Sequence, residues 1–197
     1  MKPRRKHLIV KSYDEQKEVH QIKCDDGRVI NLYIGRRYNE NSREMSPVVC
    51  EVLEVGEEID NIQKGDVLIT HHNLLTNEAL TIERNIEEQY TILSIVNDNT
   101  LYAKIKEDGS LVPINGNCIA KRIKKEIKTT LAVPFEETEE MLFDIISVPK
   151  EVDFIKEGDR VLCYKYSDYE MVYNFNNEEK RAIRIWKEDI LGIIENH

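Results

Sequence analysis

Two adjacent histidines in the stretch ITHHN, His71 and His72, are the residues best suited to metal binding or proton transfer, because imidazole does both near neutral pH. Neighbouring residues of a strand point to opposite faces, so this pair does not readily share one metal ion. The motifs GxSxG, HExxH, GxxxxGKS/T and GxGxxG do not occur in the sequence. We therefore expect no catalytic residues, no metal site and no enzymatic activity.

The four cysteines, Cys24, Cys50, Cys118 and Cys163, lack the CxxC spacing of a zinc site or a redox motif. Cys50, Cys118 and Cys163 lie within or beside apolar stretches, where a thiol acts as a small buried hydrophobe. The sequence therefore predicts reduced thiols and no disulfide framework.

Length and charge limit the classes of protein to which the chain can belong. Its 197 residues suit one large domain or two small ones, and 41% hydrophobic with 33% charged residues can fill and cover a core. The formal charge of −9 argues against a general nucleic-acid binder, although residues 2–6 (KPRRK) and 121–128 (KRIKKEIK) are locally basic. No apolar run approaches the roughly 20 residues of a membrane span. We expect a cytoplasmic protein that binds neither membranes nor nucleic acid.

An internal repeat sets the organisation of the chain. The stretches VGEEIDNIQKGD (55–66) and VPKEVDFIKEGD (148–159) align without a gap, at a constant offset of 93 residues. Gly65 and Gly158 can adopt a positive φ, and Asp66 and Asp159 can accept hydrogen bonds from nearby backbone. The pattern predicts the same tight turn in both places.

Around each turn the same elements are expected in the same order: an opening strand, a polar segment, a β-rich run, the turn and a departing strand. They are expected at residues 7–13, 14–47, 48–55, 56–65 and 66–69 in the first half, and at 117–123, 124–140, 141–148, 149–158 and 159–164 in the second. Residues 77–89 are also compatible with one helix, although their apolar spacing is irregular. Many short strands with closely spaced turns predict an all-β fold with two tandem barrels or sandwiches. The boundary is expected near Gly116.

With these elements in place, residues 48–69 (VVCEVLEVGEEIDNIQKGDVLI) resemble the GroES family of co-chaperonins, whose members carry a β run, an excursion and a VKxGDxV turn. The ending WKEDILGIIEN (186–196) resembles that family's C-terminal DILAI strand, and HLIVK (7–11) its first strand. The resemblance implies two tandem GroES-like small β-barrels. The first is residues 1–116, with a long loop at 14–47 and an insertion at 74–89, and the second is residues 117–197.

The same resemblance implies a function. Members of this family form sevenfold rings that cap an ATP-driven chaperonin chamber through mobile apolar loops. We therefore expect a co-chaperonin that assists protein folding, with a chaperonin (GroEL-like) ring and further copies of itself as partners. No cofactor is expected, because ATP is bound by the chaperonin. Two modules per chain do not divide evenly into a sevenfold ring.

Two segments are the expected docking loops. The run DDGRVINLYIG (25–35) resembles the family's GGIVL loop, with Gly27, Val29, Ile30 and Leu32 at the matching positions. In the second half, KTTLAVPFEE (128–137) places Leu131, Ala132 and Val133 at the corresponding point. Both segments are equally typical of ordinary strands, because the first alternates apolar and polar residues and the second ends at a proline.

Two other classes of protein compete with the co-chaperonin. A structural ring or adaptor, for instance of a phage particle, is favoured by the short excursions at 57–61 and 150–154 and by the insertion at 74–89. A medium-chain dehydrogenase shares this barrel in its catalytic domain, but the chain lacks a nucleotide-binding half. The clustered tyrosines Tyr164, Tyr166, Tyr169 and Tyr173 indicate an aromatic barrel face or a subunit contact.

Overall fold

The computed structural model describes residues 2–194, except 14–17, 24–28, 35–43, 46–47, 72–73, 75–77, 86–87, 89, 125–137 and 176–177. Within these residues the regular elements are β-strands and short 3-10 turns, which confirms the predicted all-β class. No helix in this part of the chain is long and apolar enough to cross a membrane.

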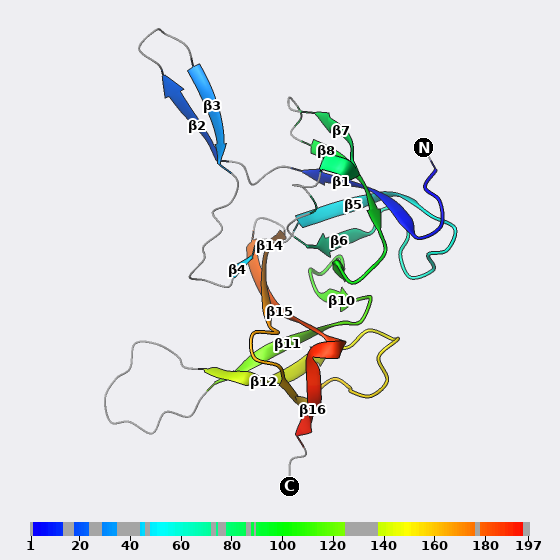
Figure 1. Ribbon diagram of the computed structural model, residues 1–197, viewed down its shortest axis with the longest axis vertical. Helices are drawn as coiled ribbons and strands as arrows, with labels where there is room; N and C mark the ends of the chain where they lie inside the picture. Colours follow the sequence, from blue (N-terminus) through cyan, green and yellow to red (C-terminus); the bar gives the residue numbers. More distant parts are fainter. Residues whose placement is uncertain are drawn as a thin grey trace.

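Seven strands of the first half form one antiparallel sheet (Figure 1). Its order is β10-β9-β6-β5-β1-β8-β7. The bounds are β1 (His7–Tyr13), β5 (Val48–Val55), β6 (Val67–Thr70), β7 (Thr81–Asn85), β8 (Tyr90–Val96), β9 (Leu101–Ile105) and β10 (Leu111–Pro113).

A second seven-stranded sheet has the order β16-β13-β12-β11-β15-β14-β4. Its strands are β11 (Asn117–Lys124), β12 (Thr138–Ser147), β13 (Arg160–Cys163), β14 (Tyr169–Phe175), β15 (Glu178–Trp186), β16 (Ile190–Ile194) and β4 (Glu44–Met45). Without the edge strands β10 and β4, each sheet has six strands, β9-β6-β5-β1-β8-β7 in the first and β16-β13-β12-β11-β15-β14 in the second. Counted along the chain within each half, these six strands have the same spatial order. A third sheet contains only β2 (Glu18–Lys23) and β3 (Val29–Ile34).

The two sheets also share their register. In the first, Val10 pairs with Val52 on the neighbouring strand, and in the second Ala120 pairs with Ile145. A bulge precedes each pair, between Ile9 and Val10 and between Ile119 and Ala120. Positions on β1 and β11 therefore correspond at an offset of 110 residues.

A second bulge recurs where β6 meets β9 and where β13 meets β16. It lies between Ile69 and Thr70 in the first sheet and between Leu162 and Cys163 in the second. Because bulges fix register and twist, two shared bulges show that the halves repeat one strand arrangement in detail.

The repeated turns are alike down to their hydrogen bonds. Gly65 N–H donates to Val52 O at 2.8 Å, and Gly158 N–H donates to Ile145 O at 2.9 Å. Their φ angles are 87° and 89°, in the left-handed region that a residue with a Cβ rarely adopts. Each aspartate closes its turn, because Asp66 Oδ2 and Asp159 Oδ2 accept from the backbone N–H three residues earlier at 2.9 Å. The turn prediction is confirmed in both halves.

Each sheet wraps around an apolar core of its own. The first core takes buried side chains from five strands, including Leu8, Val52, Leu68, Leu93 and Leu101. The second is built from Cys118, Ala120, Phe143, Ile145, Val152, Ile155, Val161, Cys163 and Ile185.

A third buried cluster joins the two sheets. Ile69, Tyr102 and Ala103 of the first sheet pack there against side chains of the second: Ile119, Met171 and Tyr173. Across the same contact, Tyr173 Oη donates to Gly109 O at 3.3 Å.

Two features depart from the sequence predictions. The helix considered for residues 77–89 is not formed in the part that the structure describes, because η2 (Glu78–Leu80) is a single 3-10 turn and β7 (Thr81–Asn85) follows it. This stretch, expected as an insertion, holds the strand that takes the place of β14 in the first sheet. In addition, β4 comes from the first half of the chain but pairs in parallel with β14, so the second sheet receives a strand from across the predicted boundary.

Candidate functional site

The first predicted docking segment lies in a β-hairpin. Val29, Ile30 and Leu32 belong to β3, where they pair with Lys23, Ile22 and His20 of β2. The hairpin is a sheet of its own and lies away from both seven-stranded sheets (Figure 1). Residues 29–34 are therefore neither an irregular loop nor an edge strand of a large sheet. Gly27 lies outside the described residues.

The second predicted docking segment, with Leu131, Ala132 and Val133, lies outside the described residues. Its place in the fold is defined by its neighbours, because residues 125–137 connect β11 to β12. Residues 14–47 connect β1 to β5, which are the equivalent strands of the first sheet. Both predicted segments thus belong to the same connection of the repeated unit.

The strands from which these two connections leave end differently in the two halves. In the first half, Ser12 is buried, and its hydroxyl donates to Val49 O at 3.2 Å. The equivalent residue in the second half is Arg122, whose Nη2 donates to Asp168 Oδ2 at 2.6 Å and whose Nη1 donates to Glu170 Oε2 at 3.1 Å. The neutral hydrogen bond of Ser12 in the first half is thereby replaced by the ion pairs of Arg122 in the second half.

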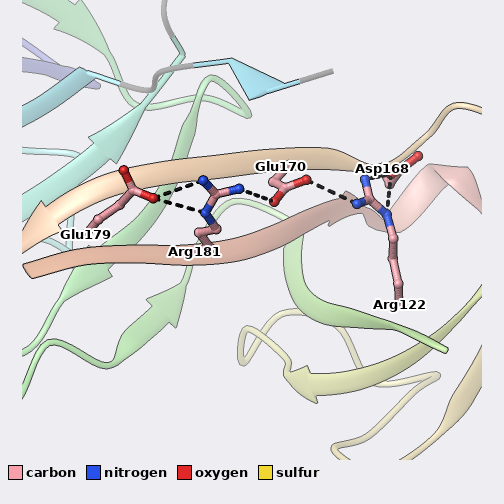
Figure 2. Close-up of polar contacts among 5 residues, drawn as sticks. All are labelled: Arg122, Asp168, Glu170, Glu179 and Arg181. Atoms are coloured by element: carbon pink, nitrogen blue, oxygen red, sulfur yellow. Dashed lines mark hydrogen bonds and ion pairs between the residues drawn. The ribbon is translucent and has the colours of Figure 1, made fainter. Parts of the chain in front are cut away.

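Figure 2 shows that Arg122 begins a row of alternating charges across β11, β14 and β15. Arg181 lies between Glu170, at 3.6 Å, and Glu179, at 2.9 Å. Partial burial acts to lower the pKa of Arg122, but hydrogen bonds and charge from Asp168 and Glu170 outweigh it and raise that pKa. We call these five residues (Arg122, Asp168, Glu170, Glu179 and Arg181) the charge row; it fixes the strand end from which residues 125–137 leave.

A polar centre at the junction of the halves is built around Asn117. This fully buried side chain donates from Nδ2 to Leu101 O at 3.0 Å and to Ile114 O at 2.9 Å. Its Oδ1 accepts from Arg184 Nε at 2.6 Å. Both the amide nitrogen and the amide oxygen of Asn117 have partners inside the protein, so this side chain ties β9, residue Ile114 and β15 together.

Aromatic rings surround Arg184 at this junction. Its guanidinium lies 5.1 Å from the ring centre of Tyr102, within the range of a cation–π contact. Tyr102 and Tyr169 meet edge to face at 5.3 Å, and His71 lies 6.2 Å from Tyr102. Burial raises the pKa of Tyr102 to about 12 and lowers the pKa of Arg184. Of the two histidines considered at the outset, His71 therefore packs in this aromatic cluster, and His72 lies outside the described residues.

A surface depression of about 520 Å³ opens beside this cluster. Burial raises the pKa of Asp189 on its wall, while Tyr164 and Tyr166 project from its rim and are more than half exposed. It is lined by Tyr164, Lys165, Tyr166, Ser167, Asp168, Tyr169, Arg184 and Asp189. The predicted tyrosine group is thus divided, because Tyr169 and Tyr173 belong to the junction and the other two face solvent.

The three described cysteines are buried, as their apolar surroundings in the sequence predicted. Cys50, Cys118 and Cys163 are buried free thiols. Burial raises the pKa to about 12 for Cys50 and Cys163 and to about 11 for Cys118, so all three are protonated at neutral pH.

Among the described residues, no three His, Cys, Asp or Glu side chains are placed to hold a metal ion. Comparison with protein-family models, with curated proteins and with solved structures gave no match.

Sequence reasoning missed Asn117, Arg184 and the charge row. Asn117 is an ordinary polar residue at the start of a predicted strand, and nothing in its neighbours marks it as buried. Arg122 and Asp168 are 46 residues apart, a separation at which no local pattern predicts a contact. Only the tyrosine cluster gave a signal, because aromatic residues are enriched at contacts between folded units.

Proposed function

We propose that this chain is a co-chaperonin, in which two tandem GroES-like barrels, residues 1–116 and 117–197, contribute to a ring that caps an ATP-driven chaperonin. One observation carries the proposal: two sheets share strand order, register and bulges, and each has a connection of the predicted docking type between its first two strands. A duplicated barrel with a loop at that point is what the sequence resemblance implies.

The hairpin β2–β3 suits a docking element because it presents Val29, Ile30 and Leu32 apart from the two large sheets. Burying one such side chain is worth about 1.5–3 kcal/mol. Ordering a segment costs about 1–2 kcal/mol per residue, so a single docking segment binds weakly. A ring that presents several segments at once gains affinity through effective concentration and still releases when its partner changes shape.

Nucleotide-dependent capture tests this proposal. The purified protein is mixed with an immobilised chaperonin in ATP, in ADP and without nucleotide, and the bound fraction is measured. We expect capture that depends on the nucleotide state. Capture by none of the three states would contradict the co-chaperonin function.

Variants locate the contact within the chain. I30D/L32D is expected to reduce capture at least tenfold, because these alternate positions of β3 share one face and two charges would enter an apolar contact. The matched control is N31D, which places one charge between the same positions and is expected to bind as the wild type does. Capture of L131D/V133D is measured in the same way to test the second segment. Unchanged capture of that variant would restrict docking to the hairpin.

A second candidate is a structural ring or adaptor. It is favoured by the buried cluster and the strand β4, which join the two halves into one building block. A protein that assembles but is not captured by a chaperonin in any nucleotide state would have this function. The same experiment therefore separates the two candidates.

A further inference from the structure

The contact between the two halves joins different faces of the repeated unit. The first half contributes the outer face of β6 and β9, with Ile69 and Tyr102, and the second half contributes the outer face of β11 and β14, with Ile119 and Met171. We call these faces the tail face and the head face. By the shared register, Ile69 of the first half corresponds to Leu162 of the second half, and Leu162 is not part of the contact. The two halves therefore meet through non-equivalent faces. A contact of this kind is heterologous, or head to tail.

The second half has a tail face of its own, and it is uncovered. Leu191 takes the position of Tyr102 in the bulge of the last strand, yet Leu191 is 47% exposed while Tyr102 is 2% exposed. Ile194 takes the position of Ile105 and is 40% exposed. Leu142 pairs with Leu162 and projects from the same face. An apolar face that is buried in one half is therefore open to solvent in the other.

The edge of this face is open as well. In the first sheet, β9 pairs on its outer side with β10, whereas β16 is the last strand of the second sheet. An exposed apolar edge strand is a template for association, and proteins normally cover or charge such edges. The side chains Leu191, Ile193 and Ile194 leave this edge apolar.

The first half has the complementary head face. Ile9 takes the position of Ile119, and Ile92 takes the position of Ala182. Thr81 takes the position of Glu170, because these two residues pair with the equivalent residues Leu93 and Ile183. A bulge then inserts Ile82, so Glu83, which pairs with Ile92, takes the position of Met171. The inserted Ile82 is 41% exposed, whereas Ile9 is buried. The chain thus ends in one free tail face and in a head face whose accessible apolar side chains are Ile82 and, in part, Ile92.

We propose that the tail face of the second half, formed by β13 and β16, binds the head face of the first half of a second copy of this chain. The contact between chains repeats the contact within the chain, which already shows that these two kinds of face are complementary. This inference rests on the ring assembly within the proposed function, and it holds for a co-chaperonin and for a structural ring alike. Head-to-tail contacts of one kind close into rings or continue as filaments.

Mixing two variants tests the inference. L191E/I194E disables the tail face, and I82E/I92E disables the head face. Each variant alone is expected to fall from an assembly to the mass of one chain in light scattering, with an unchanged circular dichroism spectrum. A one-to-one mixture is expected to form a dimer and nothing larger, because only one intact pair of faces remains. The control F154N, at an exposed position equivalent to Asn61, is expected to assemble normally.

Three results would overturn the inference: a wild-type protein that stays monomeric at micromolar concentrations, face variants that still assemble, or a mixture that yields no dimer. Chaperonin capture is scored separately on the same samples. If the wild type stays monomeric and is still captured, the proposed contact between chains is wrong and the proposed chaperonin contact stands. If the wild type assembles but is not captured, the contact between chains stands and the chaperonin contact is wrong.

Discussion

Phe143 fills in the second half the core position that Cys50 fills in the first, and both side chains are buried. On the neighbouring strand the sizes are reversed. The first half has Leu8 and Val10, and the second half has Cys118 and Ala120 at the equivalent positions. A large residue on one strand is therefore matched by small residues on the next. The two cores are thus built from different side chains at equivalent positions.

What the halves keep in common is the backbone. Both bulges, the positive φ of Gly65 and Gly158, and the aspartate hydrogen bonds recur in the same register. Volume-conserving changes are tolerated in cores, whereas a strand that slips by one residue turns its side chains to the wrong face. The comparison shows that this fold is specified by its turns and bulges more strictly than by its core residues.

The largest difference between the halves is expected at the core positions themselves. Phe143→Ala should lower the free energy of unfolding by about 3–5 kcal/mol, since it removes a fully buried ring. Cys50→Ala at the equivalent position removes one atom and should cost about 1 kcal/mol. Denaturant unfolding of both variants measures the difference. Equal losses of unfolding free energy in the two variants would contradict the interpretation that this position carries the large core residue in the second half only.

An exchange of cores sharpens this result. The triple variant C118L/A120V/F143C places the first half's side chains in the second half. It should recover more than half of the stability that F143C alone loses, because the added side chains fill the cavity. A triple variant no more stable than F143C would show that the two backbones differ where they appear alike.

The next largest effect is expected at the junction. Asn117→Ala should cost about 2–4 kcal/mol, because it leaves buried carbonyl groups and the Arg184 guanidinium without a partner. Its equivalent in the first half is His7, which is exposed, and His7→Ala should change stability by less than about 0.5 kcal/mol. Thermal unfolding of the pair checks this. A small effect at Asn117 would mean that apolar packing alone joins the halves.

The two turn glycines should behave alike. Gly65→Ala and Gly158→Ala place a Cβ where no atom lies within 4 Å, so the cost comes from the left-handed backbone alone. That cost is about 1–2 kcal/mol per residue. We expect the two losses in denaturant unfolding to agree within about 0.5 kcal/mol. A clear difference would show that one turn relaxes and the other does not.

The sequence predicted these turns well because their cause is local. Glycine and aspartate at fixed spacing specify a turn without help from the rest of the chain, and β1 and β5 have the predicted bounds. The helix considered for residues 77–89 was wrong, since pairing with β8 decides the conformation of β7 where local preference is weak. The junction and the charge row were out of reach, because Asn117, Arg184, Arg122 and Asp168 meet only after the sheets form.

The smallest expected difference lies within the shared turn. Asp66 and Asp159 make the same backbone hydrogen bond, but Asp66 also lies 3.4 Å from Lys104 Nζ, whereas Ile193 takes the lysine's position in the second half. Asp66→Ala should therefore cost about 0.2–1 kcal/mol more than Asp159→Ala, the range of partly exposed ion pairs. The excess should vanish in about 1 M salt and in a Lys104→Ile background, because either change removes the attraction and leaves the backbone hydrogen bond in place. An excess that persists under both conditions would place the difference between the two turns in their backbones, and equivalent turn geometry would then no longer account for the shared register.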